Sequence, residues 1–80
     1  MTATDLQARI KATKSFLHRE IVRNKIDPTN TTLTFREIGV RLDMIHEAER
    51  VGVRNLGEHQ DRKLRRMIRE LEAKGISNEN

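Results

Sequence analysis

Four arginines recur at helical spacing near the end of the sequence, within residues 61–76. They are Arg62, Arg65, Arg66 and Arg69. The i, i+3, i+4, i+7 pattern places all four on one face of an α-helix. The apolar residues of the same stretch repeat this spacing on the opposite face and are Leu64, Met67, Ile68 and Leu71. Guanidinium groups bind phosphate through charge and paired hydrogen bonds, so the pattern indicates an anionic partner.

The arginine stripe also has a simpler interpretation, a solvated helix face with ion pairs one turn apart. The three pairs would be Glu58–Arg62, Asp61–Arg65 and Arg66–Glu70. Such surface pairs contribute little to stability and would favour mixed charges along the stripe, not arginine four times. We favour the phosphate-facing interpretation, but the sequence leaves both open.

Composition narrows the class of protein. Eighty residues, 1–80, make a single domain, with flexible ends expected at 1–4 and 77–80. The net charge of +4 suits an anionic partner. The only aromatic residues are Phe16 and Phe35, which argues against binding RNA or single strands by base stacking. With no apolar run of membrane-spanning length and no signal peptide, a cytoplasmic location without membrane contact is expected.

The sequence contains no recognisable catalytic or metal-binding group. Cysteine is absent, and His18, His46 and His59 do not share a helix face, so no metal site is expected. Ser15 and Ser77 lie outside any nucleophile motif, and no glycine-rich phosphate loop occurs. We therefore expect neither an enzyme nor a cofactor.

The first helix is predicted from Asp5 to about Lys25, with a capping box formed by Thr4 and Gln7. Its buried stripe is predicted to contain Leu6, Ile10, Thr13, Leu17, Ile21 and Asn24. Its polar face is assigned Lys11, Lys14, Arg19, Glu20 and Arg23. Phe16 lies beside the stripe and is assigned to a wider core face.

A second helix is predicted to begin at Thr34, after a break at residues 27–32. Thr34 and Glu37 form a second capping box, and Leu33 and Ile38 have the spacing of a hydrophobic staple. The buried face is assigned Phe35, Ile38, Leu42 and Ile45. Gly39 in mid-helix would be explained by the close approach of another helix.

The stretch from Met44 to Gly57 is ambiguous. Residues 44–50 continue the second helix or begin another, and residues 51–57 form a loop or a short strand. One arrangement pairs Val51–Val53 with a short strand at Thr31–Leu33. The last helix should open at Glu58–Asp61.

The end of the last helix is readable too. Gly75 is placed to stop it, with Ile76 packing back on Leu71.

Two segments together resemble the helix-turn-helix core of small winged-helix DNA-binding domains of bacteria and phages. They are Leu-Thr-Phe-Arg-Glu-Ile-Gly at 33–39 and Arg-Arg-Met-Ile-Arg-Glu-Leu-Glu-Ala-Lys-Gly-Ile at 65–76. The resemblance covers roughly residues 15–76. It implies a mainly α domain of three to four helices, winged-helix-like, with at most a minimal β-strand pair. The chain departs from the family in its longer link between the second and third helices and in having too few residues after Ile76 for a wing.

The resemblance also implies that the start of the third helix faces the major groove. The residues it places there are His59, Gln60, Arg62, Lys63 and Arg66. Arginine can read guanine and glutamine can read adenine. We assign base contacts to Arg62 and Arg66, and phosphate contacts to Arg65 and Arg69.

The sequence therefore predicts a double-stranded DNA-binding protein, a small regulator of transcription or replication. The alternative is a small helical adaptor or inhibitor, phage-encoded or not, that docks its basic face on an acidic protein. A homodimer is also expected, with Phe16, Val22 and Ile26 of the first helix as its contact surface.

Overall fold

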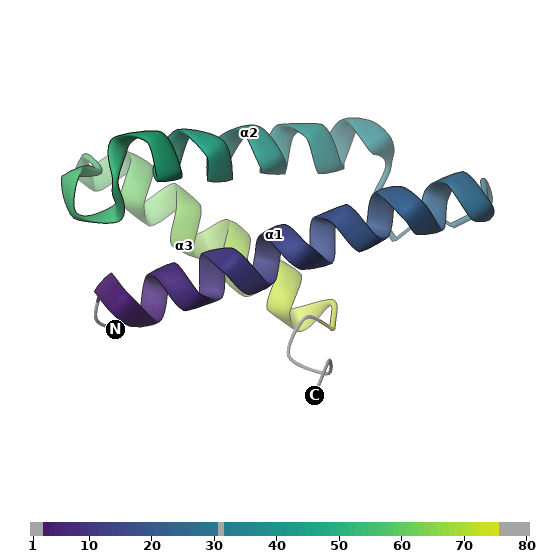
Figure 1. The fold of residues 1–80 in the computed structure, drawn as a ribbon, viewed down its shortest axis with the longest axis horizontal. Helices are drawn as coiled ribbons and strands as arrows, with labels where there is room; N and C mark the ends of the chain where they lie inside the picture. Colours follow the sequence, from purple (N-terminus) through teal and green to yellow (C-terminus); the bar gives the residue numbers. More distant parts are fainter. Residues whose placement is uncertain (1–2, 31, 76–80) are drawn as a thin grey trace.

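Three helices make up most of the described chain. The computed structural model describes residues 3–30 and 32–75. Helix α1 spans Ala3–Ile26, α2 Phe35–Val51 and α3 Glu58–Ala73, and a short 3-10 turn, η1, spans Val53–Asn55. Helices α1 and α2 run in opposite directions side by side, and α3 crosses behind them (Figure 1).

The prediction of a mainly α domain is confirmed, whereas its strands are not. No strand occurs within residues 3–30 and 32–75. Thr32 and Leu33 form a bend and Val53 begins η1, so the proposed strand pairing is wrong over the part of it that is described. Thr31 lies outside the described residues. The winged-helix resemblance remains a prediction.

A single apolar core lies between the three helices. Its largest fully buried aliphatic side chains are Leu6, Leu17, Leu33, Ile38, Ile45, Ile68 and Leu71. The predicted core face of α3 is confirmed, since Leu64, Met67, Ile68 and Leu71 are all buried. Burying one such side chain contributes about 1.5–3 kcal/mol, so burial of this stripe stabilises the packing of α3 on the other helices.

The core face of α2 differs from the prediction at its first turn. Ile38 and Ile45 are buried and Leu42 is half-buried, but Phe35 is 53% exposed. Leu33, which precedes the helix, is fully buried and fills the core at this end instead. The close approach predicted at Gly39 is also wrong within this chain, because a Cβ there would meet nothing within 4 Å.

On α1, the predicted stripe is buried except for the half-buried Ile21, and Phe16 joins the core as expected. The prediction for Glu20 is wrong. Its charge assigns it to the polar face in the sequence, yet it is only 1% exposed. Its spacing from Thr13, Phe16 and Asn24 places it on the buried side of the helix.

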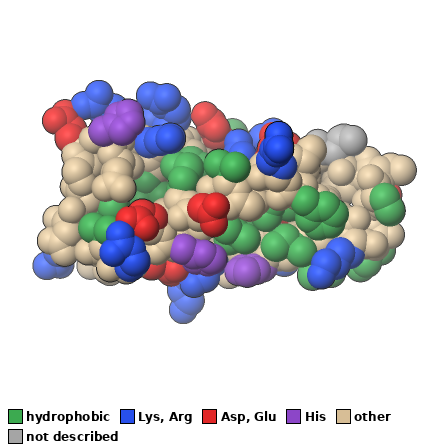
Figure 2. Space-filling view, turned by 90° about the horizontal axis from the view of Figure 1, so that it is seen from above, with side chains coloured by type: hydrophobic (Ala, Val, Ile, Leu, Met, Phe, Trp, Pro, Cys, Tyr) green, Lys and Arg blue, Asp and Glu red, His purple; other side chains and the backbone are tan. Residues whose placement is uncertain are grey.

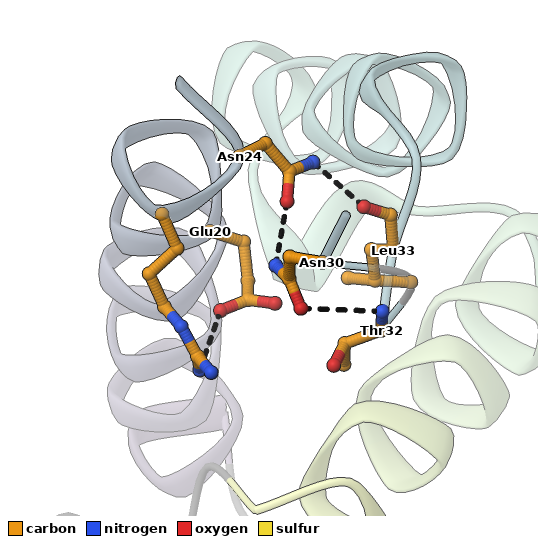
Figure 3. A network of polar contacts seen from close by, with 6 residues as sticks. Glu20, Asn24, Asn30, Thr32 and Leu33 are labelled. Carbon is orange, nitrogen blue, oxygen red and sulfur yellow. Dashed lines mark hydrogen bonds and ion pairs between the residues drawn. The ribbon is translucent and has the colours of Figure 1, made fainter. Parts of the chain in front are cut away.

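The loop after α1 is held by hydrogen bonds of Asn24 and Asn30, and Glu20 lies beside them (Figure 3). Asn24 Nδ2 donates to the carbonyl oxygen of Leu33 at 2.7 Å, and its Oδ1 accepts from Asn30 Nδ2 at 2.6 Å. Glu20 Oε2 accepts from Arg23 Nη1 at 3.0 Å. Because Asn24 bridges to Leu33, the loop is fixed at the point where α2 must begin.

The helix ends follow the sequence signals with one exception. Thr34 caps α2 as predicted: its Oγ1 accepts from the Glu37 N–H at 3.1 Å, and its own N–H donates to Glu37 Oε1 at 2.9 Å. Gly75 has φ 123°, which fits a helix stop, while Ile76 lies outside the described residues. The predicted cap at Thr4 is wrong, because α1 already begins at Ala3.

The ambiguous stretch resolves into a continued helix and a tight turn. Helix α2 runs through residues 44–50 to Val51. Gly52 then takes φ 93°, and its N–H donates to the carbonyl oxygen of Ala48 at 2.8 Å. A positive φ favours glycine, so Gly52 allows the chain to leave α2 and turn towards α3. The link between α2 and α3 is therefore longer than a simple helix-turn-helix turn, as predicted.

Replacing Thr34 with alanine should lower the free energy of unfolding by about 1 kcal/mol, because two backbone N–H groups lose their shared cap. Urea denaturation of the two proteins measures the difference. Ser15→Ala, on the exposed side of α1, serves as the control and should change stability little. An unchanged stability for Thr34→Ala would contradict the role given to this cap.

The same capping box predicts a dependence on pH. The N–H and the hydroxyl of Thr34 both interact with the Glu37 carboxylate and hold its pKa below the ordinary value of 4.5. A lowered folded-state pKa adds stability above pH 4.5, and this stability is lost as pH falls through the folded-state value. The Glu37→Gln variant should therefore lose less stability than the wild type when the pH is lowered below 4.5. Equal losses in chemical denaturation would contradict this.

Candidate functional site

The outer face of α3 presents most of the residues that the sequence selected. His59, Gln60, Arg62, Lys63, Arg66 and Arg69 are all exposed, and Arg65 is half-buried. They lie on the side of α3 away from the buried Leu64–Leu71 stripe or on its flanks. Figure 2 shows Lys and Arg side chains gathered beside a histidine along one edge of the molecule.

Four of these residues come together at one place. His59, Arg62, Lys63 and Arg66 line a shallow hollow of about 300 Å³ near the start of α3. Among the described residues, no carboxylate lines this hollow, so its lining consists of three cations and a histidine. Cations on a concave surface concentrate the field towards an approaching anion.

Arg62 forms the pair with Glu58 that the alternative interpretation of the stripe allowed, but this pair is weak. Its Nη2 donates to Glu58 Oε1 at 2.5 Å, and the two side chains are 66% and 85% exposed. Exposed pairs of this kind contribute little and are screened by salt. The guanidinium can therefore leave Glu58 for a phosphate at small cost.

Arg65 lies on a different side of the helix from the hollow. Its Nε donates to Asp61 Oδ2 at 2.9 Å, and both side chains are about one-third exposed. Glu72, two turns further along α3, forms a two-point ion pair with Arg9 of α1 that includes Arg9 Nε to Oε2 at 2.8 Å. The hydrogen bonding to Glu72 raises the pKa of Arg9 above its ordinary value. Arg65 therefore belongs to a paired flank of α3.

The remaining cations of the face differ from Arg62 and Arg65. Within the described residues, Lys63, Arg66 and Arg69 make no ion pair, so the predicted Arg66–Glu70 pair is not formed. Their positive charge is open to solvent.

Arg41 of α2 is a residue that the sequence pattern missed. It lines a second hollow together with Lys63, Arg66 and Glu70. Its Nη1 donates to the carbonyl oxygen of Glu37 at 3.1 Å, whereas its buried Nε has no partner among the described residues. The arginine adds a positive charge next to α3 from another helix. Only the packing of α2 on α3 brings it there, so spacing within one helix could not have revealed it.

Gln60 does not line the hollow formed by His59, Arg62, Lys63 and Arg66. It lines an apolar groove of about 290 Å³ between α2 and α3, against Met44, Ala48, Leu56 and Leu64. His59 and Lys63 border both features. Gln60 is therefore less well placed than Arg62 or Arg66 to meet the same ligand.

Two other findings bear on the kind of site. In residues 3–30 and 32–75, no three side chains of the metal-ligating types come close enough together to hold a metal ion. Over the same residues, no helix combines the length and the apolar character needed to cross a membrane.

Comparison with known proteins adds nothing to these features, since no family model, curated protein or solved structure matches the chain.

Proposed function

We propose that this protein binds double-stranded DNA through the basic face of α3. This face consists of His59, Arg62, Lys63, Arg66 and Arg69. The observation that carries the proposal is the hollow near the start of α3, which four of these residues line and to which no described carboxylate contributes. An α-helix with its side chains is about 10–12 Å wide, which matches the width of the major groove of B-DNA, about 12 Å.

The packing of α3 supports this role because it makes the face rigid. The helix buries four side chains in the core, and two of them, Ile68 and Leu71, are completely buried. The Arg9–Glu72 pair ties its far end to α1. A helix held in this way presents its cations without first having to be ordered, which lowers the entropic cost of binding.

The geometry also supports different roles for the arginines. Arg62 and Arg66 line the hollow near the start of α3, so we assign them the base contacts. Arg69, one turn further along, is assigned a phosphate contact. Arg65 is already paired with Asp61, so we expect it to contribute less than the sequence pattern alone implied.

The proposal includes a regulatory role in transcription or replication, of the kind performed by small winged-helix-like domains in bacteria and phages. It rests on the three-helix architecture and on a basic third helix. The resemblance noted in the sequence is the reason for preferring regulation to a purely architectural role.

A second candidate is binding to an acidic protein through the same face. The observation favouring it is the apolar groove beside His59 and Lys63. Apolar side chains of a protein could fill this groove, whereas the sugar-phosphate backbone of a nucleic acid offers no apolar side chain to fill it. DNA binding remains the first proposal because the hollow is lined by four basic side chains, which suit a phosphate backbone.

The dependence of binding on salt tests the proposal. Each phosphate that is neutralised adds about −0.9 to the slope of log affinity against log salt. Arg69→Gln should make the slope shallower by about one unit and weaken all duplex sequences alike. Arg66→Gln should instead cost roughly 1–3 kcal/mol at the preferred sequence and relax selectivity there. Fluorescence anisotropy with labelled duplexes measures both quantities.

The control for this experiment is Lys11→Gln, which removes an exposed positive charge from α1. It should leave the affinity and slope close to those of the wild type. If the wild-type protein fails to bind duplex DNA even at low salt, the proposal is wrong and the acidic protein partner takes its place.

A further inference from the structure

The solvent face of α2, which borders Lys63 and Arg66 through Val40, has features that the proposed DNA binding leaves unexplained. At its centre lie Gly39 and Val40. Val40 is 55% exposed, and Gly39 is exposed with nothing within 4 Å of where its Cβ would be. Figure 2 looks down onto this side of the molecule and shows hydrophobic side chains open to solvent between charged ones. Mid-helix glycine is unfavourable, and no contact within the described chain explains it.

Two opposite charges flank this centre at equal spacing. Arg36 lies three residues before Gly39, and Asp43 lies three residues after Val40. Both are exposed, and neither makes an ion pair among the described residues. The helical rise between them is about 10 Å, so they do not pair with each other within one chain.

We propose that this face of α2 binds α2 of a second copy in antiparallel orientation, with the two-fold axis beside Gly39 and Val40. Arg36 of each copy then lies opposite Asp43 of the other, which forms the same ion pair twice. Val40 meets Val40 across the axis, and the absence of a side chain at Gly39 lets the helices approach closely. The occupant is a second copy because the pattern is complementary to itself, as a two-fold interface requires.

Phe35 supports the same arrangement. Phe35 is 53% exposed at the start of α2, so its ring adds little hydrophobic stabilisation to the single chain. In the antiparallel pair, Phe35 reaches the level of Leu42 and His46 of the second copy. The half-buried Leu42 offers apolar surface there. The proposed contact therefore covers both Phe35 and Val40, the large apolar side chains that the described part of α2 exposes.

Helix α1 is a poorer candidate for self-association, contrary to the surface predicted from the sequence. Phe16 is buried in the core, which leaves only Val22 and Ile26 of the predicted surface exposed. The exposed charges around them on α1 are the basic residues Arg19, Arg23 and Lys25, with the acid Asp27 just after the helix beside Arg23. A two-fold contact there would bring like charges together, whereas α2 offers both signs in matched positions.

Charge reversal combined with sedimentation equilibrium on the full chain tests this proposal. The wild type should dimerise reversibly with increasing concentration. Arg36→Asp and Asp43→Arg should each weaken the dimer by at least about tenfold, because each places like charges opposite one another twice. The double variant should recover most of the affinity, since the pair is restored with its signs exchanged. Lys11→Asp, a reversal on the exposed side of α1, is the matched control and should leave the dimer unchanged.

Gly39→Leu separates association from folding. Leucine favours helix more than glycine does and has open space in the single chain, so thermal melting followed by circular dichroism should show a folded protein. The same variant should remain monomeric, because the added side chain keeps the helices apart. A wild type that stays monomeric at high micromolar concentration overturns the proposal. So does a dimer that survives Gly39→Leu or either single charge reversal.

Discussion

The packing of one apolar stripe of α3 against α1 and α2 determines the rest of the structure. Leu64, Met67, Ile68 and Leu71 are buried together, which fixes the rotation of α3 about its axis. Because the arginines repeat with the same spacing half a turn away, fixing the apolar stripe also fixes where most of them point. The basic face is thus a consequence of core packing and of the helical repeat.

The Arg9–Glu72 ion pair and the ion pairs within α3 refine this arrangement. The two-point contact between Arg9 and Glu72 joins α1 to the flank of α3. Arg65 is held on the same flank by Asp61. Lys63, Arg66 and Arg69 make no ion pair among the described residues and are exposed. The arginine stripe is thus divided: Arg65 is paired on one flank, Arg62 forms an exposed pair with Glu58, and Arg66 and Arg69 make no ion pair among the described residues.

Elements governed by local chemistry could be predicted from the sequence. The capping box at Thr34, the helix stop at Gly75 and the stripe of α3 all depend on residues within two turns of one another. Phe35 could not be assigned correctly, because the fully buried Leu33 fills the core at that end of α2. Glu20 is assigned to the polar face by its charge, although its helical spacing places it on the buried side. For the candidate site, helical spacing found the residues of α3 but not Arg41, which only the packing of α2 brings beside them. For Arg65, helical spacing allows either an ion pair with Asp61 or a phosphate contact. Spacing alone does not choose between these two roles.

A titration of isotope-labelled protein with duplex DNA, followed by amide chemical shifts, most directly tests whether α3 is the DNA-binding element. Binding through the basic face should shift the amides of residues 58–69 most, with those of α1 changing little. The side-chain resonances of Arg62 and Arg66 should move with them. Shifts confined to α1 or to the outer face of α2, with α3 unchanged, would contradict DNA binding by α3.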